Sequence, residues 1–317
     1  MRKVIGHHSV IALIEQLLKR GQLPHGLLFA GPPAVGKRLV ARLLASRILG
    51  PDSGKLVSSG THPDLHLLQL EPEKKDISVD AIRTLISKLH LKSYFGVAKV
   101  AIIDDAHRLS LAASNALLMT LEEPTPNTYL FLVTHAPHRL PQTILSRCQL
   151  LNFSELERAE GEQIICDITE NGLEGAEVNE LLNLTGGSFD ALSIDSFIDP
   201  LTLEVSNSKA MNDHLREVVS NYNVWNKKLE SLIRKDTPPG AAISLGTELA
   251  AMKESTIPPW QLVRRFVRTK LRDQPERVAW SSSLEEVIEG EALTTERNAN
   301  PQLQLSSVLL SLWQETH

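Results

Sequence analysis

The segment Gly31–Arg38 (GPPAVGKR) has the composition of a loop that binds phosphate groups. It follows an apolar run and precedes a helical pattern, which is the context such loops require. Gly31 and Gly36 let backbone amides turn toward a phosphate, and Lys37 would contact the outer phosphates. The next position normally holds Ser or Thr, whose hydroxyl binds magnesium, but here it is Arg38, which cannot bind a cation. A glycine-rich strand-to-helix turn without a ligand is the alternative interpretation.

Two carboxylates, Asp104 and Asp105, follow the apolar run Val100–Ile103. In ATPases with a phosphate loop, the first acid at such a strand end supports magnesium and the second, usually Glu, orients the attacking water. Asp104 fits the first role, whereas Asp105 is one methylene short for the second. Two acids after a strand are by themselves more typical of a solvated strand end, but their distance from Gly31–Arg38 favours a nucleotide site.

Short apolar runs alternate with longer helical patterns in the first half of the chain, which predicts an α/β fold with a five-stranded parallel sheet. The expected strands are Gly26–Ala30, Leu65–Leu70, Val97–Ile103, Tyr129–Thr134 and Gln149–Phe153. The expected helices are Val10–Arg20, Arg38–Leu49, Val79–Leu91 and Ala112–Glu122. The phosphate loop follows the first strand and the acidic pair follows the third.

Strand signals stop after Phe153, and helical patterns broken by Pro and Gly dominate the rest of the chain. A break is expected at Gly186–Ser188, a linker over Asp195–Asn207 and an interruption at the polar stretch Ala292–Gln302. We therefore expect three domains: a nucleotide-binding α/β domain over residues 1–154, a small helical lid over 155–206 and an all-helical C-terminal domain over 207–317.

The composition excludes several classes of protein. The 317 residues carry a formal net charge of −5, so the whole chain is not a basic nucleic-acid-binding protein. Two cysteines, Cys148 and Cys166, rule out a disulfide framework and a four-thiolate zinc site. The N-terminus lacks the apolar stretch of a signal peptide and no run of eighteen apolar residues occurs, which indicates a cytoplasmic protein. The eleven histidines show no spacing typical of metal ligands.

Further short motifs follow one another through the first half of the chain. In order they are Val4–Gly6, Leu23–Gly26 (LPHG), Gly60–Asp64 (GTHPD), Ala112–Leu118 (AASNALL), Leu121–Pro124 (LEEP) and Ser146–Cys148 (SRC). With these motifs, residues 1–153 resemble the AAA+ clamp-loader subunits of bacterial DNA polymerase III, most closely those of the delta-prime type. The resemblance implies an AAA+ P-loop domain, a helical lid and a helical C-terminal domain that joins an oligomeric collar.

The resemblance also gives roles to two residues outside the phosphate loop. Arg147 matches the family's arginine finger, whose planar and permanently charged guanidinium stabilises a phosphoryl group in transit on the ATP of a neighbouring subunit. Thr134 matches the sensor position that reports on the γ-phosphate. If the SRC triplet stood alone, a surface ion pair would be the simpler interpretation of Arg147.

The chain departs from the active members of this family at several points. Arg38 replaces the hydroxyl and Asp105 replaces the catalytic Glu. Asp190 stands where the lid of active relatives carries an arginine that reaches ATP, and we interpret it as an acid at a helix N-terminus. Many members hold zinc with four cysteines, but Leu49–Ser59 contains none, so we expect no zinc.

The expected function is that of a non-catalytic clamp-loader subunit within the DNA polymerase III holoenzyme, a DNA-directed DNA polymerase. The expected partners are the tau/gamma ATPase subunits and the delta subunit, and through this hetero-oligomer the sliding clamp and primed DNA at nucleoid replication forks, but no membrane. Lys37 leaves weak binding of ATP or ADP open. The alternative is an autonomous or clamp-loader ATPase that hydrolyses ATP at its own loop, with water positioned by Asp105.

Trp260–Arg272 (WQLVRRFVRTKLR) is the most basic stretch of the chain. Its spacing predicts an amphipathic helix whose apolar side holds Trp260, Val263, Phe266 or Val267, and Leu271. One interpretation is a solvated helix of the C-terminal domain, and the other is a contact with an acidic neighbour or with DNA phosphates.

Overall fold

The computed structural model describes residues 4–71, 74–192, 205, 207–234, 236–252, 258–274, 278–297 and 299–316. The chain divides into two compact units. The first comprises Met1–Gly172, Gly186–Asp190 and Ile194–Ser208, and the second comprises Leu173–Thr185, Ala191–Ser193 and Lys209–His317. Most of the expected linker, residues 195–204 and 206, lies outside the described residues. None of the described helices combines the length and hydrophobicity needed to cross a lipid bilayer.

A five-stranded parallel sheet forms the centre of the first unit, which confirms the α/β prediction. The strands are β1 (Gly26–Ala30), β2 (Leu65–Leu68), β3 (Lys99–Ile103), β4 (Thr128–Thr134) and β5 (Gln149–Asn152). Their order in the sheet is β2-β3-β4-β1-β5. β1 therefore lies between β4 and β5, and it pairs in parallel with both. Every residue of β1 and of β3 is buried, as expected for strands covered on both faces.

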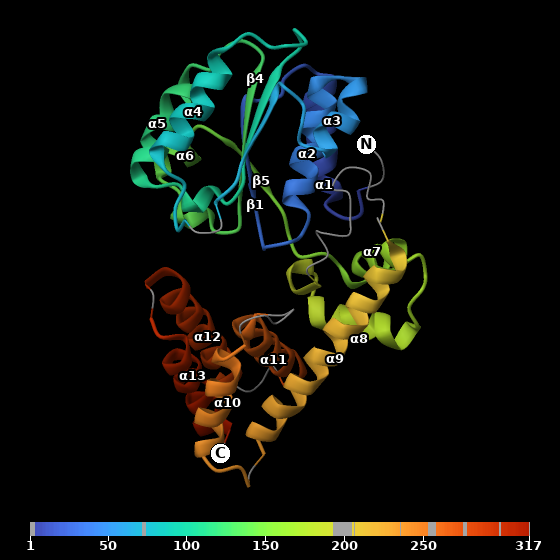
Figure 1. Cartoon of the computed structure of the whole chain (residues 1–317), viewed down its shortest axis with the longest axis vertical. Helices are drawn as coiled ribbons and strands as arrows, with labels where there is room; N and C mark the ends of the chain where they lie inside the picture. The colour runs from blue at the N-terminus through green and yellow to red at the C-terminus, as the bar shows by residue number, and fades with distance from the viewer. Residues whose placement is uncertain are drawn as a thin grey trace. The chain divides into compact units, whose positions relative to one another are not determined.

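Helices cover both faces of this sheet (Figure 1). One face carries α1 (His8–Lys19), α2 (Lys37–Leu49) and α3 (Gly54–Ser58), and the other carries α4 (Val79–His90), α5 (Leu111–Glu122) and α6 (Gln142–Leu145). After the sheet comes α7 (Arg158–Thr169). Short 3-10 turns are η1 (Pro51–Ser53), η2 (Ala106–Arg108), η3 (Pro137–Arg139) and η4 (Phe189–Leu192). The expected elements are thus present, with ends shifted by up to two residues.

Side-chain caps fix where two of these helices begin. The hydroxyl of Ser78 accepts a hydrogen bond from the backbone N–H of Ala81, and the hydroxyl of Ser110 accepts one from Ala113. Each cap satisfies one of the backbone donors that a helix N-terminus leaves unpaired. The apolar run alone placed the start of α5 one residue too late, because the cap and not the first alanine marks the boundary.

The GTHPD motif has a structural role in the first unit. The Asp64 carboxylate accepts hydrogen bonds from the backbone N–H groups of Tyr94 and Phe95, at 2.6 and 3.0 Å, and from the Ser93 hydroxyl at 3.1 Å. His62 Nδ1 in turn accepts the N–H of Asp64 at 3.1 Å. A buried carboxylate that satisfies two backbone donors holds the loop between α4 and β3 in place.

Helices make up the second unit throughout its described residues. They are α8 (Gly175–Thr185), α9 (Ser208–Leu232), α10 (Gly240–Ala250), α11 (Pro259–Asp273), α12 (Val278–Arg297) and α13 (Pro301–Thr316). Two glycines allow close packing: a Cβ on Gly246 of α10 would lie 2.7 Å from the Ser306 backbone of α13, and one on Gly290 of α12 would lie 2.7 Å from the Trp260 ring. The interruption expected from Ala292 begins later, because α12 contains no Gly or Pro after Gly290 and continues to Arg297.

Candidate functional site

The phosphate loop connects β1 to α2, as the sequence predicts. Gly31 has φ +151°, and a Cβ there would lie 2.2 Å from the carbonyl oxygen of Phe153, so only glycine fits. Gly36 has φ +99° and stands directly before the first residue of α2, in a backbone region that other residues rarely adopt. Ala34 also has a positive φ of 45°, so the loop holds a strained residue of its own.

Lys37 is turned back onto this loop. Its side chain is only 6% exposed, and Nζ donates to the carbonyl oxygen of Gly31 at 2.8 Å and to that of Pro32. These carbonyls belong to the backbone that would have to receive a phosphate. The ammonium group that was predicted to contact the outer phosphates is therefore bound to its own loop.

Arg38 reaches across to the acidic strand end. Its Nη1 lies 3.4 Å from Oδ2 of Asp104, with 38% of the arginine side chain and 19% of the aspartate side chain exposed. Asp104 is the carboxylate that was expected to support magnesium. A guanidinium beside it supplies positive charge where the cation would sit, so magnesium would have to displace an ion pair to bind there.

Asp105 and Thr134 face two histidines. Asp105 Oδ1 lies 4.0 Å from Nδ1 of His135, and the ring centres of His135 and His107 are 4.1 Å apart. The Thr134 hydroxyl accepts the N–H of Ala136 at 3.0 Å and lies 3.3 Å from Nδ1 of His107. Thr134 is 1% exposed, so its hydroxyl serves this network. The sequence spacing does not predict the contact between His107 and His135, because the two residues follow different strands.

Burial sets the protonation states of this network. It raises the pKa of Asp105 from its ordinary value, with the neighbouring Asp104 acting in the same direction. Burial also lowers the pKa of His107 to about 3, with His135 and Arg108 adding to the effect. His107 is therefore a neutral imidazole at physiological pH, and it packs against the ring of His135.

The same three side chains offer the donor set of a metal site. One ligand atom from each of Asp105, His107 and His135 lies within 4.8 Å of the others. Two imidazoles on one tetrahedral zinc ion, with bonds of about 2.0 Å, hold their ring centres roughly 5 Å apart. The observed 4.1 Å is shorter, so the rings would have to separate before both could bind one ion.

Arg147 lies at the opposite end of the sheet from the phosphate loop. It stands two residues before Gln149, the first residue of β5, and a Cβ on Gly26 at the start of β1 would lie 3.1 Å from the Arg147 carbonyl oxygen. The phosphate loop begins with Gly31, after the last residue of β1. At about 3.3 Å per residue, the strand from Gly26 to Gly31 is roughly 17 Å long, which is more than an arginine side chain can span.

The side chain of Asp190 lies outside the described residues, so its expected place in the lid stays a prediction. The basic stretch forms α11. Trp260, Val263, Phe266 and Val267 are buried, as expected for the apolar side, whereas Leu271 is only partly buried. Two of its cations pair with acids of neighbouring helices: Arg264 Nη1 lies 2.9 Å from Glu291, and Lys270 Nζ lies 3.2 Å from Glu230. These ion pairs favour the first interpretation, in which the stretch is a helix of the C-terminal domain.

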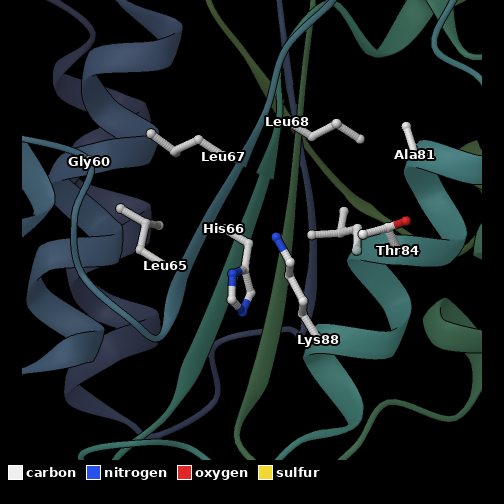
Figure 2. Close-up of a pocket in the computed structure, with 9 residues that line it drawn as sticks. Gly60, Leu65, His66, Leu67, Leu68, Ala81, Thr84 and Lys88 are labelled. Atoms are coloured by element: carbon white, nitrogen blue, oxygen red, sulfur yellow. The ribbon is translucent and has the colours of Figure 1, made fainter.

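A hollow of about 450 Å³ lies at the open edge of the sheet, between β2, α4 and Gly60 (Figure 2). Leu65 and Leu67 line it from one face of the strand, and His66 and Lys88 line it from the side of α4. β3 and β4 separate this edge from β1 and the phosphate loop. The hollow therefore takes no part in the candidate nucleotide site.

Comparisons with known proteins agree on the first half of the chain. The family model described as DNA polymerase III, delta subunit, matches residues 6–157. The delta' subunit of DNA polymerase III from Pseudomonas aeruginosa is 38% identical over 148 residues, 43% of this chain and 45% of that protein. The corresponding subunit from Bacillus subtilis is 36% identical over 159 residues, 47% of each chain. The tau subunit of Bacillus subtilis is 30% identical over 164 residues, 48% of this chain and 29% of that protein.

The match spans less than half of the length of the delta' relatives. A solved structure, that of a DNA polymerase III gamma subunit-related protein from Thermotoga maritima, aligns with 96% of this chain and 99% of its own at a TM-score of 0.49 and 18% identity, a likeness too distant to bear on function. The matched residues hold the whole parallel sheet, the phosphate loop and Arg147. Over its residues 6–157, the chain is similar to the delta' subunits of DNA polymerase III.

Proposed function

We propose that the chain is a clamp-loader subunit that does not turn over ATP itself and that supplies Arg147 to the ATP site of a neighbouring subunit. Its partners would be the tau/gamma ATPase subunits and the delta subunit, and the complex would load the sliding clamp on primed DNA in the cytoplasm, at replication forks. The three-domain division at residues 154 and 206 is part of this proposal, with the C-terminal helices joining the collar.

The position of Arg147 carries the proposal. It is a partly exposed cation at the end of the sheet that its own phosphate loop does not occupy, so it does not reach a phosphate held by that loop. The state of its own loop supports the same view. Lys37 binds loop carbonyls and Arg38 pairs with Asp104, so both cations near the loop are engaged by the chain itself.

The test is Arg147→Ala in the complex assembled with the ATPase subunits. Removal of an arginine finger in trans costs roughly 10³–10⁵ in rate at the site that it completes, and sites that lack this contact dilute the loss measured for the whole complex. We expect a clear fall in the DNA-stimulated ATPase rate with assembly unchanged by gel filtration.

Arg83→Ala is the matched control. Arg83 lies on the exposed surface of α4, 3.4 Å from Asp80, and its loss removes the same charge from the same unit. An assembled Arg147→Ala complex with the ATPase rate of the control would refute the arginine-finger role. Hydrolysis of ATP by the isolated chain would instead support the alternative, an ATPase that acts at its own loop.

A further inference from the structure

The guanidinium of Arg147 is held at three points. Nη1 donates to the carbonyl oxygen of Thr143 at 3.0 Å and to the hydroxyl of Ser146 at 3.2 Å, and Nη2 lies 2.5 Å from the Glu122 carboxylate. The first two contacts are local, because both residues precede Arg147 by a few positions. Glu122 is the only one of the three that comes from a distant part of the chain, the end of α5.

The backbone that carries Glu122 is itself fixed. His25 donates from Nε2 to the carbonyl oxygen of Leu121 at 2.7 Å, and the N–H of Glu123 closes the last turn of α5 on Met119 at 2.9 Å. Leu121 is 2% exposed and belongs to the core that α5 shares with α6. The carboxylate of Glu122 therefore extends from a rigid helix end, and it can impose a direction on the guanidinium.

The pair remains accessible, with 34% of the Arg147 side chain and 41% of the Glu122 side chain exposed. Ion pairs of such exposure add little to folding stability. What the contact does is limit the rotamers of a long side chain. A guanidinium has five N–H donors, and three contacts leave two that can still donate to phosphate oxygens.

We propose that Glu122 is the positioning residue for Arg147: it orients the guanidinium toward the phosphates of a neighbouring subunit without touching them. This proposal rests on the proposed function. A small misplacement of a catalytic group can cost as much as about 10² in rate. Because Thr143 and Ser146 would still hold Nη1, we expect loss of Glu122 to lower the complex's ATPase kcat roughly tenfold at the affected site, with the KM for ATP little changed.

The experiment compares Glu122→Ala, Glu122→Gln and Glu123→Ala in the assembled complex. Glu123 is exposed and adjacent, so its replacement makes the same change in net charge without removing the contact to Arg147. A positioning role predicts a lower kcat for Glu122→Ala, recovery of most of it in Glu122→Gln, whose amide oxygen still accepts from Nη2, and no change for Glu123→Ala. If Glu122 acted through its charge alone, its loss would make the surface more positive, and Gln would behave as Ala does.

A double-mutant cycle distinguishes the positioning role of Glu122 from the arginine-finger role of Arg147 on which it rests. With Arg147→Ala already in place, Glu122→Ala should have no further effect on kcat. If Arg147→Ala lowers the rate while Glu122→Ala does not, the positioning role is wrong and the arginine finger stands. If Arg147→Ala itself has no effect in an assembled complex, the proposed function fails first.

Discussion

The two ends of the parallel sheet hold the same kind of residue in opposite states. At the end that follows β1, Lys37 is buried and donates to the carbonyl oxygens of Gly31 and Pro32. At the other end, beside the start of β5, Arg147 is a third exposed and keeps donors to spare. Lys37 is therefore bound by its own loop, whereas Arg147 is oriented at the protein surface.

The difference shows that a motif and its function can separate. The phosphate loop keeps the residues of a nucleotide site, but its charges are satisfied by the protein. Arg147 stands in a three-residue motif of little specificity, yet its side chain is held in one direction and left accessible. The loop identifies the fold, and the opposite end of the sheet is where we expect the chemistry.

The largest effect that could break this comparison comes from removing each of the two cations in turn. Lys37→Met in the assembled complex should leave the ATPase rate within about twofold, whereas Arg147→Ala should lower it by roughly 10³ at the affected site. Steady-state ATPase assays measure both, and thermal unfolding checks that the buried methionine is tolerated. An equal loss in the two variants would mean that the chain's own loop turns over ATP.

A smaller effect is expected from restoring the missing hydroxyl. Arg38→Thr removes the guanidinium from Asp104 and supplies an oxygen ligand, so magnesium should increase the affinity of the isolated chain for ATP roughly tenfold, or about 1.4 kcal/mol. Titration with a fluorescent ATP analogue, with and without magnesium, measures the change.

Arg47→Thr is the control for that substitution, since Arg47 lies on the same helix and is lost with the same change in charge. If Arg38→Thr binds the nucleotide no better with magnesium than without it, the block lies in the closed position of Lys37. Tight, magnesium-dependent binding by the unaltered chain would show that Arg38 moves aside.

The fold could be predicted from the sequence because its signals are local. The run that forms β1 is apolar throughout, and the run that forms β3 is apolar except for Lys99. The helices of the first unit begin and end near the limits of their periodic patterns. The ends were missed where the cause was a cap, as at Ser110, or a polar residue that a helix tolerates, as in α12 after Ala292.

The site could be predicted only in part. The sequence indicated that Arg38 cannot bind magnesium, but not that it pairs with Asp104, since a side-chain contact across 66 positions leaves no periodic signal. The same holds for His107 with His135 and for Glu122 with Arg147. In the LEEP motif, the sequence presents Glu122 only as part of a family pattern. Only the packing of α5 on α6 shows that it faces Arg147.

The smallest expected effect concerns His107 and His135, at the end of the sheet that carries the phosphate loop. His107 has a pKa of about 3 in the folded chain, below its ordinary 6.5, so the unfolded chain binds the extra proton between these values. The contribution of neutral His107 to stability is therefore complete above pH 6.5 and is lost as the pH falls toward 3, with a slope of at most about 1.4 kcal/mol per pH unit.

Denaturant titrations of the free energy of unfolding between pH 4 and pH 7 measure that slope. His107→Gln should flatten it, while His90→Gln, at the exposed end of α4, should leave it unchanged. The ionisable groups near His107 include His135, His138, Arg108, Arg139 and Asp105. An identical slope in both variants would mean that His107 is protonated in the folded chain.

The close approach of Gly31 to Phe153 has a consequence for how this chain would respond to mutation. The N–H of Gly31 donates to the carbonyl oxygen of Thr134 at 3.3 Å, and the N–H of Phe153 donates to that of Ala30 at 2.7 Å, so the loop joins the ends of three neighbouring strands. A scan of substitutions scored by growth would mark Gly31 as intolerant. That intolerance would record the close packing of Gly31 on Phe153 at the carboxyl ends of these strands, and it would look the same whether or not a nucleotide ever enters the loop.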